Sequence, residues 1–105
     1  MKRIDSLRAQ LGGPRDGALL RYSLGVALLE AGDAGEAMAH LRAAVDFDNT
    51  YSAAWKQLGQ ACLRAGDAHA AADAWRRGIA AAEAHGDVQA AKEMRVFLKR
   101  LEAAR

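Results

Sequence analysis

Three histidines and one cysteine are the residues of this sequence that could bind a metal ion or act as a nucleophile. His40, His69 and His85 fall on separate predicted elements without His-x-x-x-His spacing, and Cys62 alone cannot supply a zinc finger or an internal disulfide. Cys62 also stands among apolar residues with no cation beside it in the helical pattern. We therefore predict no metal site, a buried reduced thiol and three surface histidines.

Two tryptophans and a glycine pair suggest two other kinds of chemistry. Trp55 and Trp75 could stack on a base or another flat ligand, but both occupy inward positions of their helical patterns, where tryptophan is normally core. Gly12-Gly13 lacks the following Gly-Lys-Ser or Gly-Lys-Thr of a phosphate-binding loop. We predict no catalytic residue and no cofactor, and we expect that the protein is not an enzyme.

The composition points to thin, closely packed helices. The chain has 105 residues, of which 51% are hydrophobic, largely alanine, and only 6% are aromatic. Alanine is the best helix former, and the single proline, Pro14, lies in a glycine-containing break near the start, so the rest of the chain can be helical. A chain of this length has room for one core of modest size. We expect a single all-α domain over residues 1–105.

Charge and hydropathy argue against two classes of partner. The 15 lysines and arginines are interleaved with 13 acidic residues along the chain, so no basic block of the kind that binds nucleic acid is present. No segment approaches the ~20 apolar residues that span a bilayer, and the first residues have no apolar run of signal-peptide length. We expect a cytoplasmic protein without a membrane partner.

A segment of 34 residues occurs twice in the chain. Leu58-Gly59 follows Leu24-Gly25 by 34 residues, and Gly66-Asp67 follows Gly32-Asp33 by the same distance. Further pairs keep this register: Ala27 with Ala61, Leu29 with Leu63, Ala37 with Ala71, Leu41 with Trp75, and Val45 with Ile79. We assign the repeats to residues 18–51 and 52–85, and a fixed period of this length predicts a stack of similar units.

Each repeat is predicted to consist of two helices separated by a Gly-Asp turn. Gly32 and Gly66 suit the left-handed residue that ends a helix, while Asp33 and Asp67 suit the N-cap of the next helix. Glu36 stands three residues after Asp33, which is the spacing of a capping box. Small and apolar residues at helical spacing on both sides of the turn predict closely packed helix pairs.

The two repeats resemble tetratricopeptide repeats. In that family the first helix carries Trp-x-x-Leu-Gly, the turn carries Ala-Gly-Asp, and the second helix carries an alanine, an aromatic residue and a small residue. The second repeat matches at Trp55, Leu58, Gly59, Ala65, Gly66, Asp67, Ala71, Trp75 and Gly78. The first repeat keeps Leu24, Gly25, Gly32, Asp33, Ala37 and Ala44, but has Arg21 and Leu41 where aromatic residues are usual. The resemblance implies a right-handed superhelical stack that binds other proteins.

Both ends of the chain are predicted to be capping helices. Residues 1–15 hold a helix from Lys2 to Leu11 that the Gly-Gly-Pro break ends. Residues 86–105 show no third copy of the signature, but apolar residues recur there at helical spacing between charged ones. A polar end helix is expected, because the last repeat would otherwise expose the face that a next repeat would cover. With two repeats this gives about six helices.

The resemblance also implies where a partner binds. In the family the first helix of each repeat lines a concave groove with the side opposite its packed stripe. These positions are mostly apolar in the first repeat, where they are Leu19, Tyr22, Val26, Leu29 and Glu30. They are polar and cationic in the second, where they are Lys56, Gln57, Gln60, Leu63 and Arg64. Since a contiguous apolar patch often marks an interface, we expect an extended peptide or amphipathic helix with apolar anchors and an acidic group to bind here.

Other interpretations of the apolar half stay open. The N-terminal helix could fold back over Leu19, Val26 and Leu29, which would make them core. Two copies of the chain could instead pair through the patch, so that the protein is a self-assembling homodimer. A weaker hypothesis is nucleic-acid binding by cations of the last helix: Lys92, Arg95, Lys99 and Arg100.

Overall fold

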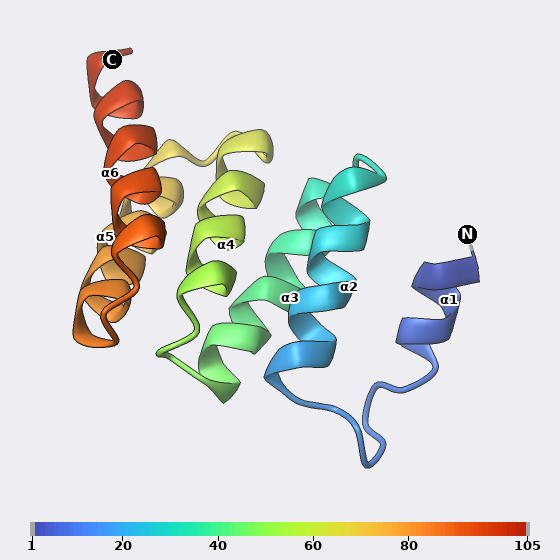
Figure 1. The fold of residues 1–105 in the computed structure, drawn as a ribbon. Coiled ribbons are helices and arrows are strands. Elements are labelled where there is room, and N and C mark those ends of the chain that lie inside the picture. The colour runs from blue at the N-terminus through green and yellow to red at the C-terminus, as the bar shows by residue number, and fades with distance from the viewer. Residues whose placement is uncertain (1, 105) are drawn as a thin grey trace.

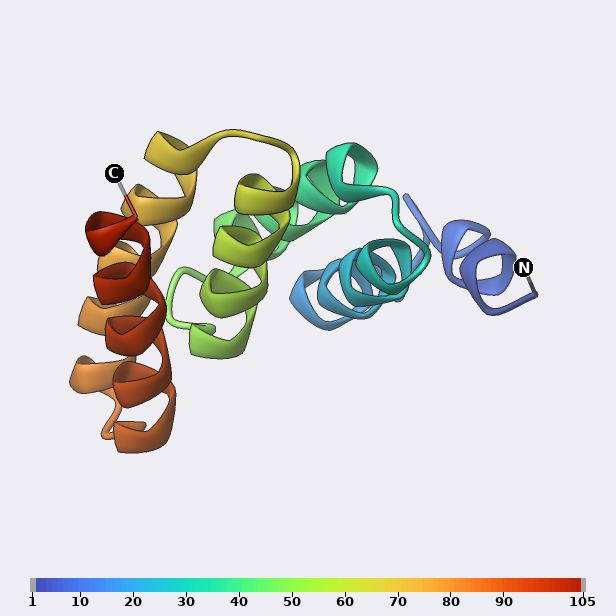
Figure 2. The same ribbon diagram turned by 90° about the horizontal axis from the view of Figure 1, so that it is seen from above.

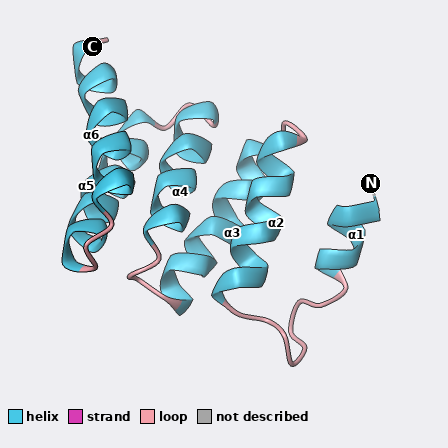
Figure 3. Ribbon diagram, viewed as in Figure 1, coloured by secondary structure: helices cyan, strands magenta, loops and turns pink. Residues whose placement is uncertain are grey.

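The computed structural model describes residues 2–104, and within that range it contains six α-helices and no strand (Figures 1 and 3). The helices are α1 (Lys2–Arg8), α2 (Ala18–Glu30), α3 (Ala34–Phe47), α4 (Ser52–Arg64), α5 (Ala68–Ala84) and α6 (Val88–Ala103). Two views place them in one row, from α1 at one end to α5 and α6 at the other (Figures 1 and 2). The prediction of an all-α stack of about six helices is confirmed.

The two predicted Gly-Asp turns form as expected. Gly32 and Gly66 each have a φ of 87°, a left-handed conformation that glycine adopts without strain. The amides of Gly32 and Asp33 donate to the carbonyls of Leu29 and Leu28 at 3.1 and 2.9 Å. This pair of bonds is the usual end of a helix at a left-handed glycine. Local hydrogen bonds therefore fix the shape of the turn.

The aspartates after these glycines cap the next helix. The side chain of Asp33 accepts a hydrogen bond from the amide of Glu36 at 3.1 Å, and that of Asp67 accepts one from the amide of Ala70 at 2.9 Å. The carboxylate of Glu36 pairs with Arg8 of α1. Glu36 thus supplies the spacing of a capping box, but its side chain ties α3 to the first helix.

A third Gly-Asp turn separates α5 from α6, and the repeat analysis did not single it out. Gly86 has a φ of 71°, and the side chain of Asp87 accepts from the amide of Ala90 at 3.2 Å. Asp87 also accepts from the hydroxyl of Ser52 at 2.7 Å, which links the starts of α4 and α6. The dipeptide itself was the available signal, since it repeats the composition of the other two turns.

The first helix is shorter than predicted. α1 ends at Arg8 rather than at Leu11, and the amides of Gln10 and Leu11 donate to carbonyls only three residues back. This tighter pattern is common where a helix ends. The chain then turns at Gly12-Gly13. α1 therefore has only seven residues.

Glycines on the first helix of each hairpin set its distance from the second. A Cβ added at Gly59 would overlap the indole of Trp75, and one added at Gly25 would lie 2.5 Å from Cγ of Leu41. Both facing side chains are fully buried. The indole N–H of Trp75 donates to the carbonyl of Lys56 at 3.2 Å, so its polar atom is satisfied inside the core.

We predict that Gly59→Ala lowers the free energy of unfolding by about 1–3 kcal/mol, because the new methyl group must displace a buried indole. The control is Gly35→Ala in α3, where the added Cβ meets open space and should raise stability by up to about 1 kcal/mol. Urea unfolding followed by circular dichroism measures both. Equal effects of the two substitutions would contradict the packing account.

Candidate protein-binding groove

The groove positions predicted on α2 differ in exposure. Leu19 is 70% exposed, while Tyr22 and Val26 are half-buried and Glu30 is exposed. Leu29 departs from the expectation of an open position, because its side chain is only 5% exposed. It belongs to the same hydrophobic cluster as Ile4 of α1, so tertiary packing has made it part of the core.

Tyr22 lies where the two hairpins meet. Its ring centroid is 5.0 Å from that of Tyr51, the residue just before α4, with the planes tilted by 35°. Burial raises the pKa of the Tyr51 hydroxyl. The pair gives the groove face an aromatic surface that also joins α2 to the start of the next hairpin.

α1 packs beside α2 at the edge of the stack. Arg3 lies 3.9 Å from Glu30 near the end of α2, and Leu7 lines a small pocket together with Leu19 and Leu20. Leu19 nevertheless stays largely exposed. The N-terminal helix therefore leaves part of the apolar half uncovered.

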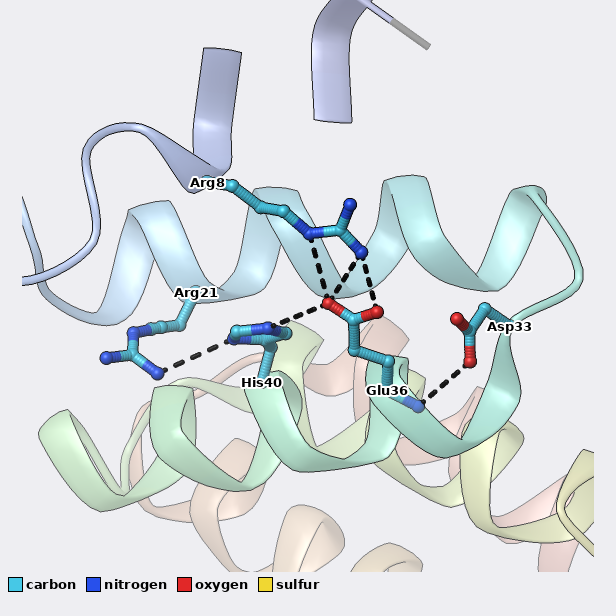
Figure 4. Close-up of polar contacts among 5 residues, drawn as sticks. All are labelled: Arg8, Arg21, Asp33, Glu36 and His40. Atoms are coloured by element: carbon cyan, nitrogen blue, oxygen red, sulfur yellow. Dashed lines mark hydrogen bonds and ion pairs between the residues drawn. The ribbon is translucent and has the colours of Figure 1, made fainter. Parts of the chain in front are cut away.

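A chain of polar side chains holds this edge together (Figure 4). Nη2 of Arg8 donates to both carboxylate oxygens of Glu36, at 2.6 and 2.7 Å. His40 lies 3.5 Å from Glu36 through Nε2 and 3.5 Å from Arg21 through Nδ1. Because arginine only donates, Nδ1 of His40 is the acceptor of this contact when the ring is neutral. The side chain of His40 is 13% exposed, which corrects the prediction of a surface histidine.

Asp16 fixes the connection between α1 and α2. Its carboxylate accepts from Nε and Nη2 of Arg21 at 2.8 and 3.0 Å and from the amide of Gly12 at 2.9 Å. These hydrogen bonds hold the pKa of Asp16 well below its usual range, and the bond with Arg21 has the largest effect. The hydrogen bond from Arg8 lowers the pKa of Glu36 in the same way. Both carboxylates stabilise this edge only while they are ionised.

The groove positions on α4 are partly engaged with α6. Nζ of Lys56 lies 3.0 Å from a carboxylate oxygen of Glu93, so this cation already has an acidic partner. Arg64 is exposed and has no acidic partner in the described part of the chain; its Nη1 donates only weakly, at 3.4 Å, to the carbonyl of Leu29. The remaining positions are half-buried or exposed: Gln57, Gln60 and Leu63.

α6 provides a third wall that the sequence analysis treated only as a polar cap. It lies against both α4 and α5, and a pocket of about 360 Å³ opens between these helices. The pocket is lined mainly by Leu63, Trp75, Phe97 and Leu101, together with the polar residues Gln60 and Arg100. The rings of Trp75 and Phe97 lie 5.5 Å apart. Phe97 is the residue that sequence reasoning missed, and its signal was the helical spacing to Leu101.

The residues with catalytic side-chain types do not converge. His69 and His85 are exposed, Cys62 is buried, and burial raises the pKa of its thiol. Trp55 and Trp75 are core residues, as predicted. Among residues 2–104 no group of three or more His, Cys, Asp or Glu side chains is placed to hold a metal ion. None of the helices in this range has the length and apolar character needed to cross a membrane.

Paired helices joined by Gly-Asp turns and stacked in one row define a helical repeat protein. No protein-family model matches the sequence. The chain is 50% identical over 102 residues to TPR repeat-containing protein PA0015 of Pseudomonas aeruginosa, and the match covers 97% of each chain. The chain belongs to the tetratricopeptide repeat family, whose members are in general modules for protein–protein interaction and non-enzymatic scaffolds.

Two solved structures share the architecture. The solution structure of protein BPP2914 from Bordetella parapertussis superposes with a TM-score of 0.81 at 45% identity, over 98% of this chain and 87% of that one. The crystal structure of MamA gives a TM-score of 0.70 at 21% identity, over 95% of this chain and 65% of that one. The second likeness is one of fold alone.

We predict that Asp16→Asn lowers the thermal midpoint at neutral pH and makes the protein less sensitive to acid. Because the pKa of Asp16 in the folded state is below its ordinary value of 3.8, its stabilisation is complete above that value and is lost as the pH falls through the folded-state pKa. The difference in thermal midpoint between wild type and variant should therefore become smaller as the pH falls from about 5 to about 2. Asp46→Asn, at an exposed carboxylate of α3, is the control. A gap that does not change with pH would refute the role of the ionised carboxylate.

Proposed function

We propose that this protein is a cytoplasmic adaptor that binds a segment of a partner protein along the face formed by α2 and α4. The observation that carries the proposal is that apolar side chains stay exposed on helices whose packed faces are already filled. Leu19 is 70% and Leu63 is 40% exposed, and both lie on the arc that the family uses for its groove. Exposed apolar surface of this kind favours a partner that can cover it.

The charges beside these residues favour an acidic group in the partner. Lys56 is neutralised by Glu93, so the acidic contact falls to Arg64, which has no carboxylate of its own within residues 2–104. An extended peptide or an amphipathic helix could place an apolar side chain on Leu63 and a carboxylate on Arg64 at the same time.

We predict that Arg64→Glu weakens capture of the native partner at least about tenfold, which corresponds to about 1.4 kcal/mol. The control is Arg77→Glu on α5, which reverses a charge in an exposed pair with Asp73 and should leave binding unchanged. Pull-down from the native cell with quantitative mass spectrometry compares the two. If both variants lost the same amount of partner binding, or if the loss came with reduced helicity, the proposed groove site would be wrong.

Self-association through the apolar half is the second candidate, and the exposure of Leu19 supports it. A symmetric pair would cover Leu19 of both copies. We predict for this candidate that Leu19→Ser weakens the self-association of a Phe47→Ala chain in sedimentation equilibrium. A wild-type chain that sediments as a monomer at every concentration would exclude it.

A further inference from the structure

α6 repeats the groove pattern of α4 at a spacing that differs from the sequence period. α4 starts 34 residues after α2, but α6 starts 36 residues after α4, because α5 is three residues longer than α3 while the connection after it is one residue shorter. In this register the buried Met94 corresponds to Leu58. The positions that correspond to the groove residues Lys56, Gln60, Leu63 and Arg64 are then Lys92, Val96, Lys99 and Arg100.

The three cations at these positions are exposed. Lys92, Lys99 and Arg100 form no ion pair with any described residue, and Arg64 of α4 shares this property. Arg95 differs, because it pairs with Glu83 of α5. Near the ends of α4 and α6, the side chains of Arg64, Lys99 and Arg100 therefore carry positive charge without an acidic partner among the described residues.

The pocket between α4 and α6 borders this cationic surface, because Arg100 lines it and Leu63 in its wall precedes Arg64. Its volume of about 360 Å³ is at the lower end of the ~300–1,000 Å³ range of ligand pockets, which suits one bulky side chain. Trp75 and Phe97 supply aromatic walls, and the hydrogen bond from the indole of Trp75 to Lys56 holds that wall in place. A matching group is an apolar or aromatic side chain with carboxylates next to it.

The chain itself carries such a group at the end of α3. Phe47 is 57% exposed, whereas the other aromatic side chains of the described residues are buried or half-buried. It stands between Asp46 and Asp48, which are both exposed. The guanidinium carbon of Arg21 lies 5.9 Å from the Phe47 ring centroid, a contact that leaves more than half of the side chain open. Asp46 is exposed and forms no ion pair with another of residues 2–104.

We propose that Phe47 of one copy inserts into the pocket between α4 and α6 of a second copy, with Asp46 and Asp48 facing Arg64, Lys99 and Arg100. Donor and acceptor are different surfaces of the chain, so the contact is heterologous and can link further copies. An apolar anchor in a pocket with charges around it is the usual arrangement of a strong interface contact. This association uses neither Leu19 nor the α2 half of the groove.

The experiment separates donor from acceptor. A ¹⁵N-labelled Phe47→Ala chain keeps the pocket but has no anchor, and an unlabelled Arg100→Glu, Leu101→Glu chain keeps the anchor but has a damaged pocket. When they are mixed, the indole N–H resonance of Trp75 in the labelled chain should shift in a saturable way. Adding unlabelled Phe47→Ala instead should leave the resonance where it was. Circular dichroism checks that each variant remains helical.

A second experiment tests which acidic residue faces which cation, by reversing the charges of two exposed residues. Arg100→Glu as a single substitution should weaken self-association of the chain at least about tenfold in sedimentation equilibrium. Adding Asp46→Arg to the same chain should restore part of this self-association. Leu19→Ser should have no effect on this association. The absence of a Trp75 shift up to about millimolar partner, or a shift that persists without Phe47, would overturn the proposal. A different result would refute this inference but not the adaptor function: capture of the partner depends on Arg64, while the Trp75 resonance does not shift.

Discussion

A glycine that faces a bulky side chain sets the distance between paired helices, and the rest of the stack depends on that distance. The backbone of α4 comes so close to α5 at Gly59 that one added carbon would overlap Trp75, and Gly25 faces Leu41 in the same way in the first hairpin. Because each hairpin has a contact of this kind between its own two helices, the two hairpins have similar shapes and can stack on one another. Close approach of backbones thus replaces large side chains, which explains how a chain with 6% aromatic residues fills its core.

The same contact also shapes the surface that is open to a partner. Trp75 fills the space above Gly59 and, with Phe97, forms a wall of the pocket between α4 and α6. A residue that supports the core is therefore also part of the candidate binding surface. Such a wall is rigid, since the indole is packed and its N–H is bonded to a backbone carbonyl. A rigid wall lowers the entropy lost when a side chain binds.

The sequence by itself determined the helical hairpins and most of their core. A left-handed glycine followed by an N-capping aspartate is a local arrangement, so Gly32-Asp33 and Gly66-Asp67 could be recognised without any knowledge of tertiary contacts. Burial of Trp55 and Trp75 followed from helical periodicity in the same way. The family was recognisable for this reason, because its signature consists of residues that act within one hairpin.

Only the tertiary structure decided which groove positions stay open and where the third wall lies. Leu29 became core, and Lys56 was paired with Glu93, through contacts between helices that are far apart in the sequence. The equivalence of α6 to α4 was hidden because the longer α5 and the shorter connection after it together shift the register by two residues. Helical periodicity gives the direction in which a side chain points from its own axis. It does not give the neighbour that the side chain meets, since that depends on how the helices pack.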